Sequence, residues 1–189
     1  FDRLDGARDV ETFVIDGSTY AIIASWDDDG VQIINVTDPA NIVATDSETD
    51  GANGFTMLSK ANGVSVFTIG GSTYAIVTAM HDNGVQIIDV SDPDNLVAKG
   101  AETDEADGFT ELTKVIDVDT FVIGDKTYAI TVSAFSEDGV QMIDISDPDN
   151  MVAKDAKTDG DSGGFDRLDG ARDVETFVID GSTYAIIAS

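Results

Sequence analysis

The chain is a series of short apolar runs separated by polar turns, and the series recurs. Residues 20–39 hold an apolar run, an acidic turn, a second apolar run and the dipeptide Asp38-Pro39. The same order returns at residues 74–93 and 128–148, and it begins again at Tyr184. Apolar runs of this length between turn residues predict β-strands, because helices need ten or more periodic positions.

The repeat length is nearly constant along the chain. Phe13, Phe67, Phe121 and Phe177 are counterparts, at intervals of 54, 54 and 56 residues. Residues 1–25 are identical to residues 165–189 at all 25 positions, which indicates a duplicated block of three units. The chain then looks like a window cut from a longer array, and a designed or truncated chain would look the same. We expect one repeat array divided into units at residues 1–62, 63–116, 117–172 and a partial unit at 173–189.

Each unit is predicted to form four short antiparallel strands. Asp16-Gly17 joins the first two strands as a two-residue hairpin turn. The polar segment at residues 45–54 varies most among the units, so we expect an exposed loop there. In the first unit the predicted strands cover residues 9–15, 19–24, 31–36 and 42–44.

The third strand of each unit is apolar on both faces. Val31 and Ile33 point to one side of the strand, and Ile34 and Val36 point to the other. A strand that is buried on both faces has this pattern, and no helix-length periodic segment exists to cover it. The sheets are therefore expected to cover one another, around a ring or along a stack.

The composition restricts the partners. Asp and Glu number 37 against 10 Lys and Arg, and the resulting charge of −27 repels nucleic acid and anionic membranes while attracting cations. With 42% hydrophobic residues the chain is not a disordered acidic tail. It has no Cys, no apolar run of membrane-spanning length and no visible signal peptide. This acidity favours a salt-adapted, extracellular or cell-surface setting, and no nucleic acid or membrane insertion is expected.

The repeated residues resemble a known family. Tyr20-Ala-x-x-Ala, Gly30-Val-Gln-Ile-Ile-Asn-Val and Thr37-Asp-Pro look like the LVIVD repeat, a β-propeller blade of bacterial and archaeal surface proteins. The resemblance implies an all-β propeller of four-stranded antiparallel blades, and it implies display or binding at a cell surface. These units are longer than a typical blade of that family. Three whole blades and half of a fourth cannot close a ring alone, since propellers have about 4–8 blades.

Two acidic segments are candidate cation sites. Asp46, Glu48 and Asp50 alternate before Gly51, a spacing that suits the oxygen ligands of Ca²⁺. The segment is not an EF-hand, because Met57 stands at its twelfth position and no helices flank it. The alternative is a solvated acidic loop.

The second candidate is Asp27-Asp28-Asp29, at a predicted hairpin tip. Here too a cation is weighed against a simpler role, in which the charges keep a β-rich surface from aggregating.

Two further features are interpreted structurally. Residues 160–164 spell Gly-Asp-Ser-Gly-Gly, as in serine proteases, but His81 is the only histidine and lies in another turn, so the match is attributed to chance. Trp26, Met80 and Phe135 recur after the second strand, and we assign them to packing rather than to a ligand-stacking rim.

From sequence alone we predict a non-enzymatic structural or adhesive protein of the cell surface. It would assemble with itself by blade-to-blade packing, as a homo-oligomer or a longer array, even a filament. The alternative is a glycan- or protein-binding propeller module with calcium-dependent stability, partnered by a glycan or a surface protein.

Overall fold

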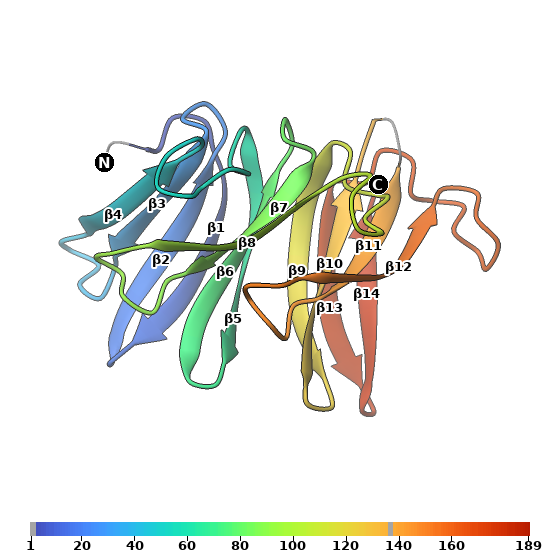
Figure 1. The fold of residues 1–189 in the computed structure, drawn as a ribbon. Coiled ribbons are helices and arrows are strands. Elements are labelled where there is room, and N and C mark those ends of the chain that lie inside the picture. The colour runs from blue at the N-terminus through green and yellow to red at the C-terminus, as the bar shows by residue number, and fades with distance from the viewer. Residues whose placement is uncertain (1–2, 136–137) are drawn as a thin grey trace.

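The computed structural model describes residues 3–135 and 138–189, and every regular element in this part of the chain is a β-strand (Figure 1). Three four-stranded antiparallel sheets, here called blades 1 to 3, are followed by a two-stranded hairpin. In each blade the strands lie side by side in chain order, so neighbouring strands are joined by short connections. The all-β class and the four-stranded blades predicted from sequence are confirmed.

The strand bounds repeat from blade to blade. Blade 1 consists of β1 (Ala7–Ile15), β2 (Ser18–Ser25), β3 (Gly30–Asn35) and β4 (Val43–Thr49). Blade 2 consists of β5 (Ala61–Ile69), β6 (Ser72–Ala79), β7 (Gly84–Asp89) and β8 (Val97–Thr103). Blade 3 consists of β9 (Val115–Ile123), β10 (Lys126–Ser133), β11 (Gly139–Asp144) and β12 (Val152–Thr158). The half blade consists of β13 (Asp173–Ile179) and β14 (Ser182–Ala188).

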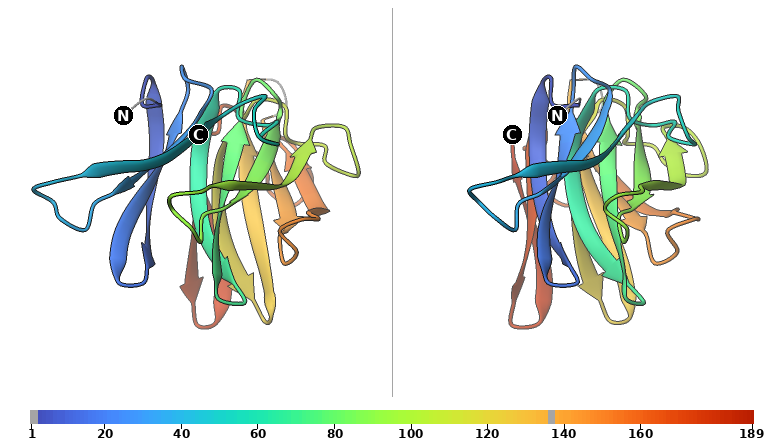
Figure 2. Two further views of the ribbon diagram at one scale, coloured as in Figure 1. Left: turned by 60° about the vertical axis from the view of Figure 1, so that its left-hand side comes forward. Right: turned by 90° about the vertical axis from the view of Figure 1, so that its left-hand side faces the viewer.

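Local turn chemistry sets the first hairpin of each blade. Asp16 and Gly17 have φ angles of 49° and 81°, the left-handed pair that a type I′ turn needs. The turn places Ile15 opposite Ser18, and the pairing then runs along both strands. The first hairpins of the three blades and the half blade all turn at the same end of the molecule (Figure 2).

The blades form a curved row, with blade 1 at one end and with blade 3 and β13–β14 at the other (Figure 1). The first strands β1, β5, β9 and β13 contact one another in succession, so they form the inner edge of the row. Apolar side chains fill the space between successive blades in three separate cores. Ile22 and Ile33 of blade 1, for example, share a core with Val64 and Ile88 of blade 2. Sheets therefore cover sheets, as the two apolar faces of the third strands predicted.

The fourth strand differs from its prediction. β4 covers Val43–Thr49 rather than residues 42–44, so the first part of the predicted loop at 45–54 is strand. The backbone of β3 pairs with it as far as Gly30↔Thr49, across an irregularity between Gln32 and Ile34. An outermost strand needs no alternating apolar face, and sequence pattern therefore underestimates its length.

Buried glutamines fasten each blade to the segment that leads into it. Gln86 is fully buried on β7. Its Oε1 accepts hydrogen bonds from the backbone N–H groups of Thr56 and Met57 at 2.9 and 3.2 Å, and its Nε2 donates to the carbonyl of Lys99 at 3.1 Å. Gln32 and Gln141 make corresponding bonds in blades 1 and 3. Backbone groups that a turn leaves unpaired are satisfied in this way.

Candidate functional site

Carboxylates gather where the inner strands run side by side. Strands β1, β9 and β13 each contribute two, and all six line one cavity of about 100 Å³. The period of two along a strand places both residues of each pair on the same face. We call this group the axial carboxylate cluster, and it consists of Asp9, Glu11, Asp117, Asp119, Asp173 and Glu175.

Blade 2 is the exception in this pattern. Gly63 and Ser65 stand on β5 where the other inner strands carry carboxylates. A Cβ on Gly63 would lie 2.5 Å from Oδ1 of Asp117 and 2.7 Å from its Cα, so β5 and β9 can approach only because this side chain is missing. The absence of a carboxylate in blade 2 therefore makes room for Asp117.

Several members of the cluster also connect neighbouring blades. Asp9 Oδ2 accepts a hydrogen bond from the backbone N–H of Val64 at 2.8 Å. Asp117 Oδ2 accepts the corresponding bond from Val174, also at 2.8 Å. Asp119 Oδ2 accepts two bonds from Thr176, one from its backbone N–H at 2.7 Å and one from its hydroxyl at 2.6 Å. These bonds hold the carboxylates in place on rigid strands.

Burial changes the proton affinity of the cluster. It raises the pKa of Asp117 to about 7, and the charges of Asp9 and Asp173 add to this effect. The N–H groups of Val174 and Val118 act in the opposite direction but do not cancel it. Burial also raises the pKa of Glu11. At neutral pH, Asp117 therefore carries a proton for a large part of the time, while ordinary aspartates do not.

The structure gives the residues of the calcium candidate separate partners. Asp46 lies on β4, where its Oδ2 accepts a bond from the backbone N–H of Leu96 in blade 2 at 2.8 Å. Glu48 accepts bonds from the side chain of Asn53. Asp50 Oδ1 accepts one from the N–H of Leu58 at 3.2 Å. Calcium binding there stays a prediction, which melting of the protein with and without a chelator would test.

The second candidate, Asp27-Asp28-Asp29, lies in the β2–β3 turn and holds nearby backbone. Asp28 Oδ2 accepts a bond from the N–H of Asp5 at 2.8 Å, and Asp29 Oδ1 accepts one from the N–H of Lys60 at 2.8 Å. Asp27 and Asp29 also form ion pairs with the Lys60 ammonium, both at 3.7 Å. Within the described residues, no three His, Cys, Asp or Glu side chains are grouped as metal ligands.

The remaining sequence features lie apart from the axial carboxylate cluster. Ser162 of the protease-like motif is exposed in the segment between β12 and β13, and His81 lies in the β6–β7 turn beside Trp26, with ring centroids 6.4 Å apart. Phe135 is 60% exposed, and the Arg172 guanidinium lies over its ring. At this position the ring therefore packs against a cation rather than in the apolar core.

Sequence reasoning missed the axial carboxylate cluster. The signal was present as Asp-x-Glu or Asp-x-Asp in the first strands, a polar alternation in an otherwise apolar repeat. Which strands would share an inner edge was not visible in the pattern, so the carboxylates were not recognised as neighbours.

Comparison with known proteins gives the architecture but no family. No protein-family model and no curated protein matches the chain. Among solved structures, a functionally unknown protein from Desulfotomaculum acetoxidans DSM 771 superposes with a TM-score of 0.63 at 13% identity, over 95% of this chain and 48% of that one.

Two similar structures are glycoside hydrolases. A variant of the GH43 protein BlXynB from Bacillus licheniformis has a TM-score of 0.61 at 15% identity, over 97% of this chain and 37% of that one. An exo-β-1,3-galactanase from Phanerochaete chrysosporium has a TM-score of 0.62 at 12% identity, over 98% and 43%. This chain has a β-propeller fold. It spans less than half the length of these three proteins.

One prediction from sequence is overturned here. The prediction of a structural or adhesive protein without enzymatic activity is wrong as stated. The same arrangement of blades occurs in glycoside hydrolases. The sequence contains no linear catalytic motif that would have indicated otherwise. Carboxylates on separate strands form no such motif until the propeller brings the strands together.

In the described part of the chain, no helix is long and apolar enough to cross a membrane.

Proposed function

We propose that this chain belongs to a glycan-cleaving β-propeller whose axial carboxylate cluster supplies the acid and the base. Glycosidic bonds are cleaved by two carboxyl groups, one that is protonated at working pH and one that is ionised. The observation that carries the proposal is the raised pKa of Asp117, about 7, inside a cavity lined by further carboxylates. The names of the similar structures, GH43 protein and exo-β-1,3-galactanase, support a carbohydrate substrate.

Asp117 would be the general acid in this reaction. Its carboxyl group would donate a proton to the glycosidic oxygen as the bond to the leaving sugar breaks. A group with a pKa near the working pH both holds the proton and releases it readily.

Asp119 would be the partner carboxylate. It lies two residues further along β9 and on the same face of the strand, and its bonds from Thr176 fix its orientation. A fixed carboxylate can activate a water or stabilise positive charge that develops on the sugar ring.

The cavity itself is small for a sugar. A volume of about 100 Å³ is below the roughly 300 Å³ at which ligand pockets begin. The substrate would therefore reach the carboxylates from the open side of the row, where no blade follows β13–β14 in this structure. Blades on that side would complete the pocket.

The test is hydrolysis of a panel of aryl glycosides and of xylan, β-1,3-galactan and fructan. We expect Asp117→Asn to lower the rate at least about 100-fold, since a removed general acid costs that much. Asp94→Asn is the matched control, because Asp94 is an exposed carboxylate in the β7–β8 connection. An active protein whose rate survives Asp117→Asn would refute the assigned role, and a protein that binds these glycans without cleaving any would refute catalysis.

We also propose that the protein is located outside the cell or on its surface, and that its repeat units are LVIVD repeats. The charge of −27 supports the location, because an acidic surface suits a salty exterior. The third strands, which contain Val31-Gln, Val85-Gln and Val140-Gln, support the repeat assignment. Fractionation of the native cells with an antibody to the protein would test the location.

A further inference from the structure

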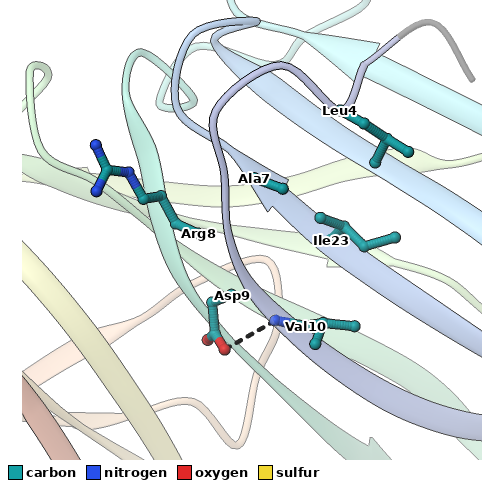
Figure 3. A pocket seen from close by; sticks show the side chains of 6 residues that line it. All are labelled: Leu4, Ala7, Arg8, Asp9, Val10 and Ile23. Carbon is teal, nitrogen blue, oxygen red and sulfur yellow. Dashed lines mark hydrogen bonds between the residues drawn. The ribbon is translucent and has the colours of Figure 1, made fainter.

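The two ends of the row expose surfaces that are covered everywhere else. On blade 1, the outward face holds Val10, which is 56% exposed. Its counterparts Val64, Val118 and Val174 are each only 3% exposed, because the preceding blade covers them. Val10, Ile23 and Leu4 line a hollow of about 600 Å³ on this face (Figure 3). The face has the shape and chemistry of an interface between blades, without the preceding blade.

The half blade exposes the opposite face. Ile186 on β14 is 61% exposed, whereas its counterparts Ile22, Ile76 and Ile130 are 0%, 0% and 7% exposed. Strand β14 also has no third strand at its outer edge, since β13 and β14 form a sheet of two. The half blade therefore lacks a third strand, a fourth strand and a following blade.

Blade 1 of a second copy supplies what the half blade lacks. Residues 165–189 are identical to residues 1–25, so β13–β14 of one copy can replace β1–β2 of another with the same side chains. In blade 1, β2 pairs with β3 from Tyr20↔Asn35 to Ser25↔Gly30. The same backbone bonds are available to residues 184–189, and Ile186 would then occupy the fully buried position of Ile22.

We propose that two copies of residues 1–189 close a six-bladed ring by exchanging these hairpins. Each copy contributes three blades, and at each of two junctions β13–β14 of one copy joins β3–β4 of the other. One copy gives three blades and three copies give nine, whereas rings of about 4–8 blades close. Two copies are the number that fits, and the displaced β1–β2 hairpins lie outside the ring. In the ring, Asp173 and Glu175 of one copy take the places of Asp9 and Glu11 of the other, so the axial carboxylate cluster keeps its residue types.

The exchange conserves the hairpin contacts and adds new burial. The outward positions of β3–β4 gain a covering blade, since blade 3 comes attached to the exchanged hairpin. Ile42 is 48% exposed, while its counterparts Leu96 and Met151 are 5% and 4% exposed. Burial of such apolar area at both junctions favours the ring.

The hydrogen bond between blades 1 and 2 that involves Asp46 also has its counterpart at the junction. Asp46 of blade 1 accepts a bond from the N–H of Leu96 in blade 2. Asp155 of blade 3 stands where Asp46 does, and Ile42 stands where Leu96 does. The ring brings Asp155 of one copy to Ile42 of the other.

Identical hairpins allow a matched test in the full chain. Ile22→Asp and Ile186→Asp change the same residue of the same 25-residue sequence. In the ring, Ile186 is buried and Ile22 lies in the displaced hairpin, so Ile186→Asp lowers the melting temperature by about 10 °C or more and Ile22→Asp leaves it nearly unchanged. In a single copy the two effects are reversed, and that order would overturn the proposal.

The mass in solution gives the second measurement. Light scattering is expected to show twice the chain mass of 19.9 kDa. Ile42→Asp is expected to halve this mass, whereas Val122→Asp, at a 60% exposed position of blade 3, leaves it unchanged. A single chain or an open polymer for unmodified residues 1–189 would overturn the ring.

Discussion

Gly63 lies directly against the carboxylate of Asp117, and a Cβ at this glycine would come within 2.5 Å of Oδ1. The counterparts of Gly63 in the other units are the aspartates Asp9, Asp117 and Asp173. The one unit that departs from the repeated residue thus does so where β5 lies against Asp117 of β9. Sequence divergence at this point reflects packing around a buried carboxyl group.

Restoring the repeated residue is therefore expected to harm the protein. Gly63→Ala should lower the free energy of unfolding by about 2 kcal/mol, because the new Cβ meets backbone atoms of β9 as well as Asp117. Gly63→Asp should cost more, since it adds a like charge beside Asp117. Urea denaturation measures both variants, with Thr68→Ala at an exposed position of β5 as the control. Equal or greater stability of Gly63→Asp would contradict the packing described.

Asp117 should make stability depend on pH. Its folded pKa, about 7, lies above its ordinary value of 3.8, so the folded protein holds a proton that the unfolded chain releases. The contribution of this carboxyl group to the free energy of unfolding is fully present below about pH 4. It is lost as the pH rises through 7, and the loss amounts to up to about 4 kcal/mol.

Asp117→Asn removes this titration. The variant should gain stability over the unmodified protein as the pH rises from 5 to about 8. Urea denaturation at several pH values measures the difference, and Asp94→Asn serves as the exposed control. A difference that stays constant with pH would show that the carboxyl group titrates normally.

Gln86 should contribute more to stability than most polar residues. Gln86→Ala leaves the N–H groups of Thr56 and Met57 and the carbonyl of Lys99 without their partner. We expect a loss of about 2–4 kcal/mol, because buried polar groups that lose their bonds keep their desolvation cost. Thermal melting compares the variant with Thr68→Ala, and a loss below about 1 kcal/mol would mean that water replaces the side chain.

Salt should stabilise the protein. A charge of −27 on one chain repels itself most strongly in the compact state, and dissolved ions screen that repulsion. The melting temperature is expected to rise by about 5 °C or more between about 0.05 M and 1 M NaCl. Glycerol at matched osmolality separates screening from general solute effects. A flat profile in NaCl would show that the acidic side chains are already neutralised by their local partners.

The sequence by itself determined the blades. Turn position and the two apolar faces of the third strand follow from contacts within a few residues. Asp16-Gly17, for example, adopts the left-handed angles that its hairpin requires. Because such preferences are local, they can be interpreted without knowing which blades become neighbours.

The tertiary structure decided the rest. The extent of β4, the bonds of Gln86 and the meeting of six carboxylates at one cavity all depend on strands that are distant in sequence. Ile22 and Ile186 make the distinction plain, since they hold the same place in identical sequences and are 0% and 61% exposed. Burial and proton affinity are properties of what packs against a residue, and only the arrangement of the blades sets that.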